Sequence, residues 1–214
     1  MKRRMLPFLT VLLCMGSGLM AQEPHLGFGL NLSFPTGDFR NKTYPPDSQV
    51  LTTQREGYDV GLGAQFTLSF PVEQNVAFRL NFNGQVTNGT WTAATYEREN
   101  LQHSIFSLGG DLQLFVNGSA SRHRGTYFLG GLSADFERFD RSYGDFNSYY
   151  SYDDTTTERK SRLGGNFGLG QSFGFAGARF TLEATFHKTL SGNDAAKGEP
   201  PSADFSRVSF GWVF

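Results

Sequence analysis

The sequence predicts an all-β chain that closes into an eight-stranded antiparallel up-and-down transmembrane β-barrel. Three observations predict it: eight segments alternate apolar and polar residues, the connections between them alternate short and long, and glycine and aromatic residues are abundant. The chain has 214 residues with 26 Gly and 22 Phe, yet its mean hydropathy is −0.36. A polar average with many aromatics is typical of a barrel in which only one face of each strand meets lipid.

The first residues have a composition of their own. Three cations at positions 2–4 precede an apolar run from Met5 to Met15, and Ala21 is the small residue that cleavage requires. This pattern predicts a secretory signal peptide over residues 1–21, followed by an outer-membrane β-barrel domain over residues 22–214.

The mature part carries a small excess of negative charge. Of the 19 basic residues three lie in the signal, which leaves 16 against 20 acidic residues. No basic patch typical of nucleic-acid binding is present, so we expect no nucleic-acid partner. The one cysteine, Cys14, also lies in the signal. The mature chain therefore has no thiol, which excludes disulfides, thiolate metal sites and cysteine nucleophiles.

Apolar residues alternate with small or polar ones in eight segments. From Leu26 to Phe34 the even positions are apolar and the odd positions before Phe34 are Gly, Asn or Ser. Because side chains along a strand alternate between two faces, each segment has one apolar face. Even positions form this face in every segment except the sixth, where odd positions do. The seven later segments begin at Tyr58, Phe78, Phe106, Tyr127, Arg162, Arg179 and Arg207, with Tyr58 in the apolar row.

The apolar face is expected to point outward, toward lipid. The lumen of an eight-stranded barrel is just wide enough for side chains to fill it, and the Phe and Leu residues of the apolar face would overfill it. A sheet in hydrocarbon must also close, so that no backbone edge is left unpaired. A soluble lipocalin-like barrel would have the reverse arrangement, with an apolar interior.

The connections between the segments alternate in length. Short periplasmic turns and longer extracellular loops are the layout of outer-membrane barrels, and an even strand number places both termini in the periplasm. The expected turns are residues 71–75, 117–124 and 174–177, and the expected loops are residues 35–56, 87–100, 138–160 and 191–204.

The last segment ends with Val208, Phe210, Trp212 and Phe214 at steps of two. This ending resembles the C-terminal signature that the barrel-assembly machinery reads, which implies that these residues are an assembly signal and the machinery a partner during biogenesis. The mature chain resembles the small eight-stranded barrels typified by outer membrane protein X and the transmembrane domain of outer membrane protein A, within the "outer membrane protein beta-barrel domain" families of Gram-negative bacteria. The resemblance implies a place in the bacterial outer membrane, in contact with its lipids and lipopolysaccharide.

Charged residues of both signs fall on the inward face. Arg79, Asp111, Glu183 and Arg207 are expected at similar depth, where they would form a structural ion-pair network, because buried charges need partners. Such a network would plug the lumen. The alternative is a narrow gated pore, controlled by which pairs form. The plug predicts little or no steady conductance in planar bilayers, and a large stable pore would contradict it.

An enzyme is the alternative class of function, because small barrels include lipid A deacylases and palmitoyltransferases. A Ser–His pair would need both side chains within hydrogen-bond reach and facing the lipid. His187 points to the lumen by parity and has no serine two positions on, and His103 and Ser104 face opposite ways. We therefore expect no enzyme, no catalytic or metal-binding residues and no cofactor.

Specific function is expected in the long extracellular loops, where binding residues concentrate. The segment Arg141–Asp154 is rich in tyrosine, a residue that provides contact area at low entropic cost. It predicts a structural or surface-interaction role, such as adhesion to an extracellular protein or matrix ligand. The alternative is a polar loop with aromatics near the lipid headgroups. The candidate contact residues are Tyr143, Tyr149, Tyr150 and Tyr152.

Overall fold

The computed structural model describes residues 23–40, 42–44, 54–92, 98–144, 154–191 and 203–214. The predicted signal peptide lies outside these ranges, as do Tyr149, Tyr150 and Tyr152. Among the described residues, no helix is long and apolar enough to cross a membrane.

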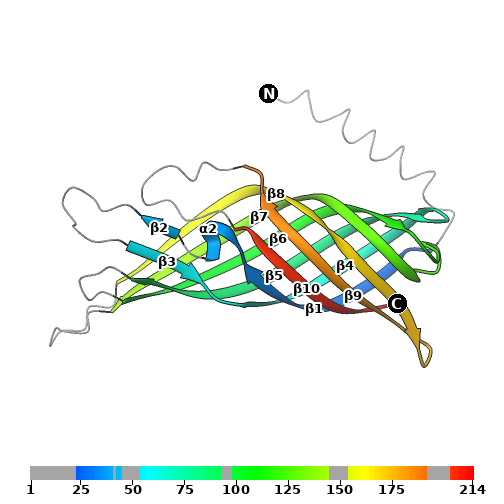
Figure 1. The fold of residues 1–214 in the computed structure, drawn as a ribbon, viewed down its shortest axis with the longest axis horizontal. Helices are drawn as coiled ribbons and strands as arrows, with labels where there is room; N and C mark the ends of the chain where they lie inside the picture. Colours follow the sequence, from blue (N-terminus) through cyan, green and yellow to red (C-terminus); the bar gives the residue numbers. More distant parts are fainter. Residues whose placement is uncertain (1–22, 41, 45–53, 93–97, 145–153, 192–202) are drawn as a thin grey trace, which may run out of the picture.

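Eight antiparallel strands form a closed barrel, which confirms the predicted fold (Figure 1). The first strand pairs with the last, Gly27 lying opposite Val213, and so closes the sheet without a free edge in the membrane. The barrel strands are β1 (His25–Pro35), β4 (Gly61–Glu73), β5 (Val76–Thr92), β6 (Arg98–Phe115), β7 (Gly125–Gly144), β8 (Asp154–Phe175), β9 (Ala178–Thr189) and β10 (Phe205–Val213).

Three short elements lie at one end of the barrel, opposite the end where the C-terminus lies (Figure 1). They are α2 (Gly37–Arg40), β2 (Lys42–Tyr44) and β3 (Gln54–Tyr58). β2 and β3 form an antiparallel pair, and β3 also pairs with the upper part of β5. This end carries the long connections, so we refer to it as the extracellular end.

The two faces of the strands differ as the alternation predicts. Leu30, Leu112 and Phe167 point outward and are 56%, 60% and 62% exposed, whereas Asn31 and Asp111, one position away from the first two, are 3% and 1% exposed. The outward row continues around the barrel as a belt of Leu, Phe and Val side chains. Phe167 also confirms that odd positions face outward in the sixth barrel strand, β8.

Tyr58 does not belong to the outward row, and its predicted orientation is wrong. Leu62 of β4 lies opposite Val86, but Tyr58 of β3 lies opposite Gly89, so one extra residue is accommodated between β4 and β3. Such a bulge reverses the facing of every residue beyond it. Tyr58 therefore points inward and is 4% exposed.

Two of the predicted loops are largely strand. β5 continues to Thr92 and β6 begins at Arg98, within the expected loop 87–100. Likewise β7 continues to Gly144 and β8 begins at Asp154, within the expected loop 138–160. Beyond the lipid both faces of a strand meet water, so pairing continues without the apolar alternation by which strands are recognised.

Candidate functional site: the filled lumen and the extracellular wall

The centre of the lumen holds a buried group of ion pairs. Arg79 donates from Nε and Nη2 to Asp111 Oδ2 at 3.2 and 2.9 Å, and from Nη1 to Glu183 Oε1. The Tyr127 hydroxyl donates to the same Glu183 oxygen at 2.6 Å. All four residues are at most 3% exposed. β5, β6, β7 and β9 thus send one polar side chain each to a single point, where one guanidinium faces two carboxylates.

Arg207, the fourth residue of the predicted network, lies one layer away. In the register of β9 and β10 it is opposite Thr185, whereas Glu183 is opposite Ser209. Its Nε donates to Thr185 Oγ1 at 3.3 Å. Arg207 is therefore near the two carboxylates without sharing the hydrogen bonds that join Arg79 to them.

A second polar layer lies nearer the extracellular end. His187 Nε2 is 3.2 Å from Asp135 Oδ2, and its Nδ1 is 2.9 Å from Asn166 Oδ1. His103 Nε2 is 3.4 Å from Glu137 Oε2, and Arg162 Nε is 3.8 Å from the same oxygen. The histidines and acids of this layer are therefore paired with each other, between neighbouring strands in the case of His103 and Glu137.

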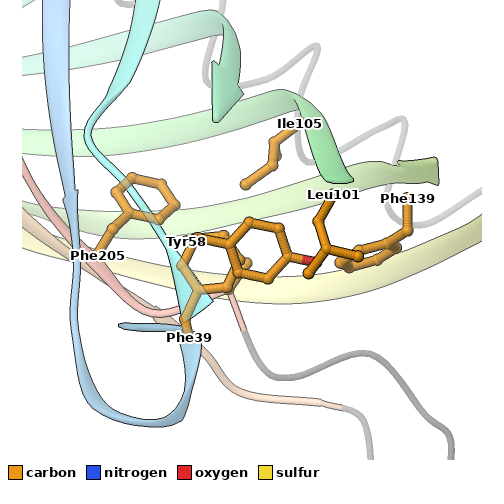
Figure 2. Close-up of a cluster of buried hydrophobic side chains, with 7 residues drawn as sticks. Phe39, Tyr58, Leu101, Ile105, Phe139 and Phe205 are labelled. Atoms are coloured by element: carbon orange, nitrogen blue, oxygen red, sulfur yellow. The ribbon is translucent and has the colours of Figure 1, made fainter. Parts of the chain in front are cut away.

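Aromatic side chains fill the extracellular mouth. Figure 2 shows the rings of Phe39 and Tyr58 at the centre, with Phe205 on one side and Phe139 on the other. Phe39 stacks on Tyr58 with ring centroids 4.5 Å apart, and His103 stacks on Phe139 at 3.9 Å. Phe39 comes from α2, so the first extracellular connection folds back into the mouth that it spans.

The periplasmic end is covered by the turn between β6 and β7. Ala120 in this turn is fully buried, and its backbone N–H donates to the carbonyl of Gln74 at 2.8 Å. His123 Nδ1 lies 3.2 Å from Ser172 Oγ, and its ring packs against Phe115 and Tyr127. Burial lowers the pKa of His123 to about 4, so the ring is neutral at neutral pH.

A cavity between the central ion pairs and the covering turn offers about 10 Å³ to water, which corresponds to about one molecule. Arg79, Glu183, His123, Gln65 and Thr181 are among its lining residues. Within the described ranges, no group of three or more His, Cys, Asp or Glu side chains is arranged to hold a metal ion.

The apolar parts of the lumen were missed by the sequence interpretation, which assigned only polar side chains to it. Phe115, Phe139 and Phe205 occupy odd positions in strands whose even positions face lipid, so the same alternation could have assigned them to the lumen. No periodic signal marked Phe39, because it lies in a four-residue helix.

The residues of the predicted assembly signal lie in and directly after β10. Val208, Phe210 and Phe214 are 42%, 41% and 72% exposed on the outer surface, and Trp212 packs beside Phe210 with ring centroids 5.3 Å apart. Of the four candidate contact tyrosines, Tyr143 lies in the upper part of β7, and the other three fall outside the described residues.

The described strands continue beyond the membrane on one side of the barrel only. A strand needs about 9–11 residues to cross the membrane. β5, β6, β7 and β8 have 17, 18, 20 and 22 residues, whereas β1, β9 and β10 have 11, 12 and 9. The long strands thus form a paired sheet above the membrane. We call it the extracellular wall; it comprises residues 87–92, 98–104, 137–144 and 154–162.

Comparison with known proteins identifies the fold. No protein-family model and no curated protein matches the sequence. The outer membrane protein OprG of Pseudomonas aeruginosa is similar to this chain with a TM-score of 0.50 and 10% identity, over 90% of this chain and 96% of OprG. Ail, the attachment invasion locus protein of Yersinia pestis, gives a TM-score of 0.49 and 13% identity, over 91% of this chain and 100% of Ail.

At sequence identities of 10–13%, these similarities show the fold alone. That the chain lies in a membrane follows from its own outer surface. The outward belt of Leu, Phe and Val is exposed on all sides of a closed sheet, an arrangement that suits hydrocarbon. The chain is therefore an eight-stranded outer-membrane β-barrel protein, with the architecture of the small barrels of bacterial outer membranes.

Proposed function

We propose that the chain is a surface-interaction protein, in which a closed barrel holds the extracellular wall above the membrane to bind an extracellular protein or matrix ligand. The observation that carries the proposal is the one-sided length of the strands, 22 residues in β8 against 9 in β10. Strands that continue in pairs beyond the lipid present a rigid surface, which binds at lower entropic cost than a free loop.

The edge of the extracellular wall formed by β8 also has backbone N–H and C=O groups that a partner could bind. β9 pairs with β8 only from Gly164 onward, and within the described part of the chain residues 155–162 pair with β7 alone. An unpaired strand edge can accept an extended segment of a partner as an additional strand. The side chains along this edge include Thr156, Thr157, Glu158 and Arg159, all exposed, which suits a polar partner.

The proposal is tested by removing the tip of the wall without disturbing its base. Arg141 lies opposite Thr156, so replacing residues 142–155 with Asn-Gly joins the pair through a two-residue hairpin turn. Binding of the purified, refolded protein to immobilised extracellular-matrix proteins would be measured by surface plasmon resonance. We expect the shortened chain to lose at least about tenfold in affinity, because contact area and edge are both removed.

A control variant of unchanged length distinguishes the contribution of the paired strands to binding from that of the tyrosine side chains. The variant with Tyr143, Tyr149, Tyr150 and Tyr152 all changed to Ser keeps the wall and removes only the aromatic contacts. Heat-modifiable gel mobility reports whether each barrel is folded. If the shortened, folded chain binds as well as the wild type, the wall is not the binding surface.

We also propose that the lumen is closed to steady ion flow, rather than gated. Three features in series support this: aromatic rings at the mouth, ion pairs at the centre and a covering turn at the periplasmic end. The plug that we propose is therefore polar at its centre and includes apolar side chains at both ends of the lumen. The expectation of no steady conductance in planar bilayers applies unchanged.

We propose that the chain is not a lipid A-modifying enzyme. A base that acts on lipid must face the membrane, and the four histidines of the chain, at positions 25, 103, 123 and 187, are at most 7% exposed and turn inward or into the periplasmic turn. A change in the mass of lipid A on expression of the chain would contradict this proposal.

A further inference from the structure

The upper part of β8 has a row of backbone groups that point toward its free edge. Where β9 ends, the Leu163 carbonyl accepts a hydrogen bond from the Leu190 N–H at 2.7 Å, and the Leu163 N–H donates to Ser191 Oγ at 2.7 Å. The N–H and C=O groups of every second residue in a strand point to the same side. Those of Ser161 and Arg159 therefore face this edge, because the register with β7 is unbroken here.

A strand added at this edge would continue the line of β9. β9 runs antiparallel to β8 and ends at Thr189, opposite Gly164. An added antiparallel strand would exchange two hydrogen bonds with each of Thr157, Arg159 and Ser161, which gives about six backbone bonds in total. Its side chains would alternate between the outer face of the wall, beside Arg159, and the inner face.

The outer face of this edge carries positive charge that is balanced only in part. Arg138 of β7 lies directly opposite Arg159, and both side chains are exposed. Arg138 Nε is 2.9 Å from Asp140 Oδ2, whereas the Arg159 side chain forms no hydrogen bond or ion pair with the part of the chain that the structure describes. Two guanidinium groups and one carboxylate leave one positive charge. A carboxylate on the strand residue opposite Arg159 would balance it.

We propose that this edge binds an extended acidic segment of the extracellular partner as an additional antiparallel strand, with one carboxylate of the segment opposite Arg159. The inference rests on the proposed function, because the edge belongs to the extracellular wall, and it specifies the chemistry of the partner. Backbone bonds give affinity for an extended chain, and the arginine selects among such chains. On the inner face Glu158 Oε1 is 3.3 Å from Lys160 Nζ, so that pair is neutral and the acidic residue is needed on the outer face alone.

The charge part of the proposal is tested with a synthetic peptide of about nine residues, the length of an ordinary strand. Threonine and glutamine alternate around one central glutamate, and a matched peptide has lysine at the centre. Binding to the folded mature protein in detergent micelles would be measured by fluorescence anisotropy. We expect the wild type to prefer the glutamate peptide at least about fivefold, and Arg159→Glu to prefer the lysine peptide, because the charges then pair in the opposite sense.

The backbone part is tested at Ser161. Ser161→Pro removes an N–H group that faces the edge and places the proline ring where the added strand would lie, without removing a bond to β7. Ser161→Ala is the matched control, because it keeps the N–H group. We expect Ser161→Pro to abolish measurable binding of the glutamate peptide and Ser161→Ala to bind as the wild type does. Heat-modifiable gel mobility reports whether each variant is folded.

A modified peptide tests the same contact without any change in the barrel. Methylation of the backbone nitrogens at the central glutamate and at every second residue from it is expected to abolish binding. Full binding by the folded Ser161→Pro chain or by the methylated peptide, or equal binding of the glutamate and lysine peptides, would overturn the proposal. A wild type that binds matrix proteins but neither peptide would retain the proposed function and refute the acidic strand.

Discussion

Arg79→Met is expected to destabilise the barrel by about 3–5 kcal/mol, because it removes the one cation that lies between two buried carboxylates. Arg79 donates hydrogen bonds to both Asp111 and Glu183, and each of the three side chains is at most 3% exposed. Methionine fills a similar volume but offers no hydrogen bond. The two carboxylates then repel each other across the centre of the lumen, where water has little access.

The free energy of unfolding in urea, with the barrel in detergent micelles, measures this effect. Arg122→Met, on the exposed periplasmic turn, controls for the loss of charge and should leave stability within about 0.5 kcal/mol of the wild type. Arg79→Met combined with Asp111→Asn should recover part of the loss, because the one carboxylate that remains, Glu183, then lies near the buried Arg207. An Arg79→Met chain as stable as the wild type would show that the three charges are not energetically coupled.

The second large effect concerns acid. The pKa of His123 falls to about 4 in the folded chain, because burial beneath the barrel disfavours the charged ring and the neighbouring His25 adds to this. The unfolded chain has the ordinary value of about 6.5 and takes up the proton first. Stability that is fully present above about pH 6.5 is therefore lost as the pH falls toward 4, by about 2.5 kcal/mol between pH 7.5 and 4.5.

His123→Asn is the informative variant. Asparagine tolerates the left-handed backbone at this position, where φ is 44°, and its amide can bond to Ser172, but it does not titrate. The free energy of unfolding of His123→Asn should therefore decline less than that of the wild type over the same pH range. Parallel profiles would show that acid acts through other groups.

The sequence predicts the membrane part of this fold well, because lipid imposes a strict alternation on it. The run from Leu26 to Phe34 is apolar at every even position, and the structure exposes each of those side chains on the outer surface. Above the lipid this constraint ends. For that reason the sequence pattern predicts loops where the structure has the upper parts of β5 to β8. The bulge that turns Tyr58 inward does not alter the alternation of apolar residues in the sequence, so it could not be predicted from it.

The candidate sites were predictable to the extent that they depend on parity and register. Parity placed Arg79, Asp111 and Glu183 inside, and their contacts follow from the pairing of β5 with β6 and from a meeting across the lumen with β9. The pairing of β7 with β8 above the membrane, which continues to Tyr143 opposite Asp154, could not be predicted. It requires the register of β7 and β8 across a connection whose length says nothing about where pairing resumes.

The pairing of β1 with β10 is the contact that completes the barrel. Gly27 and Val213 come from opposite ends of the described chain, so the contact that closes the barrel has nearly the largest sequence separation available to it. Contacts of this kind form slowly, because a long segment must be ordered before they stabilise anything. Until β10 arrives, both outer strands of the growing sheet carry unpaired N–H and C=O groups that can join another chain. We therefore expect the yield of folded protein to depend on how long that open sheet persists.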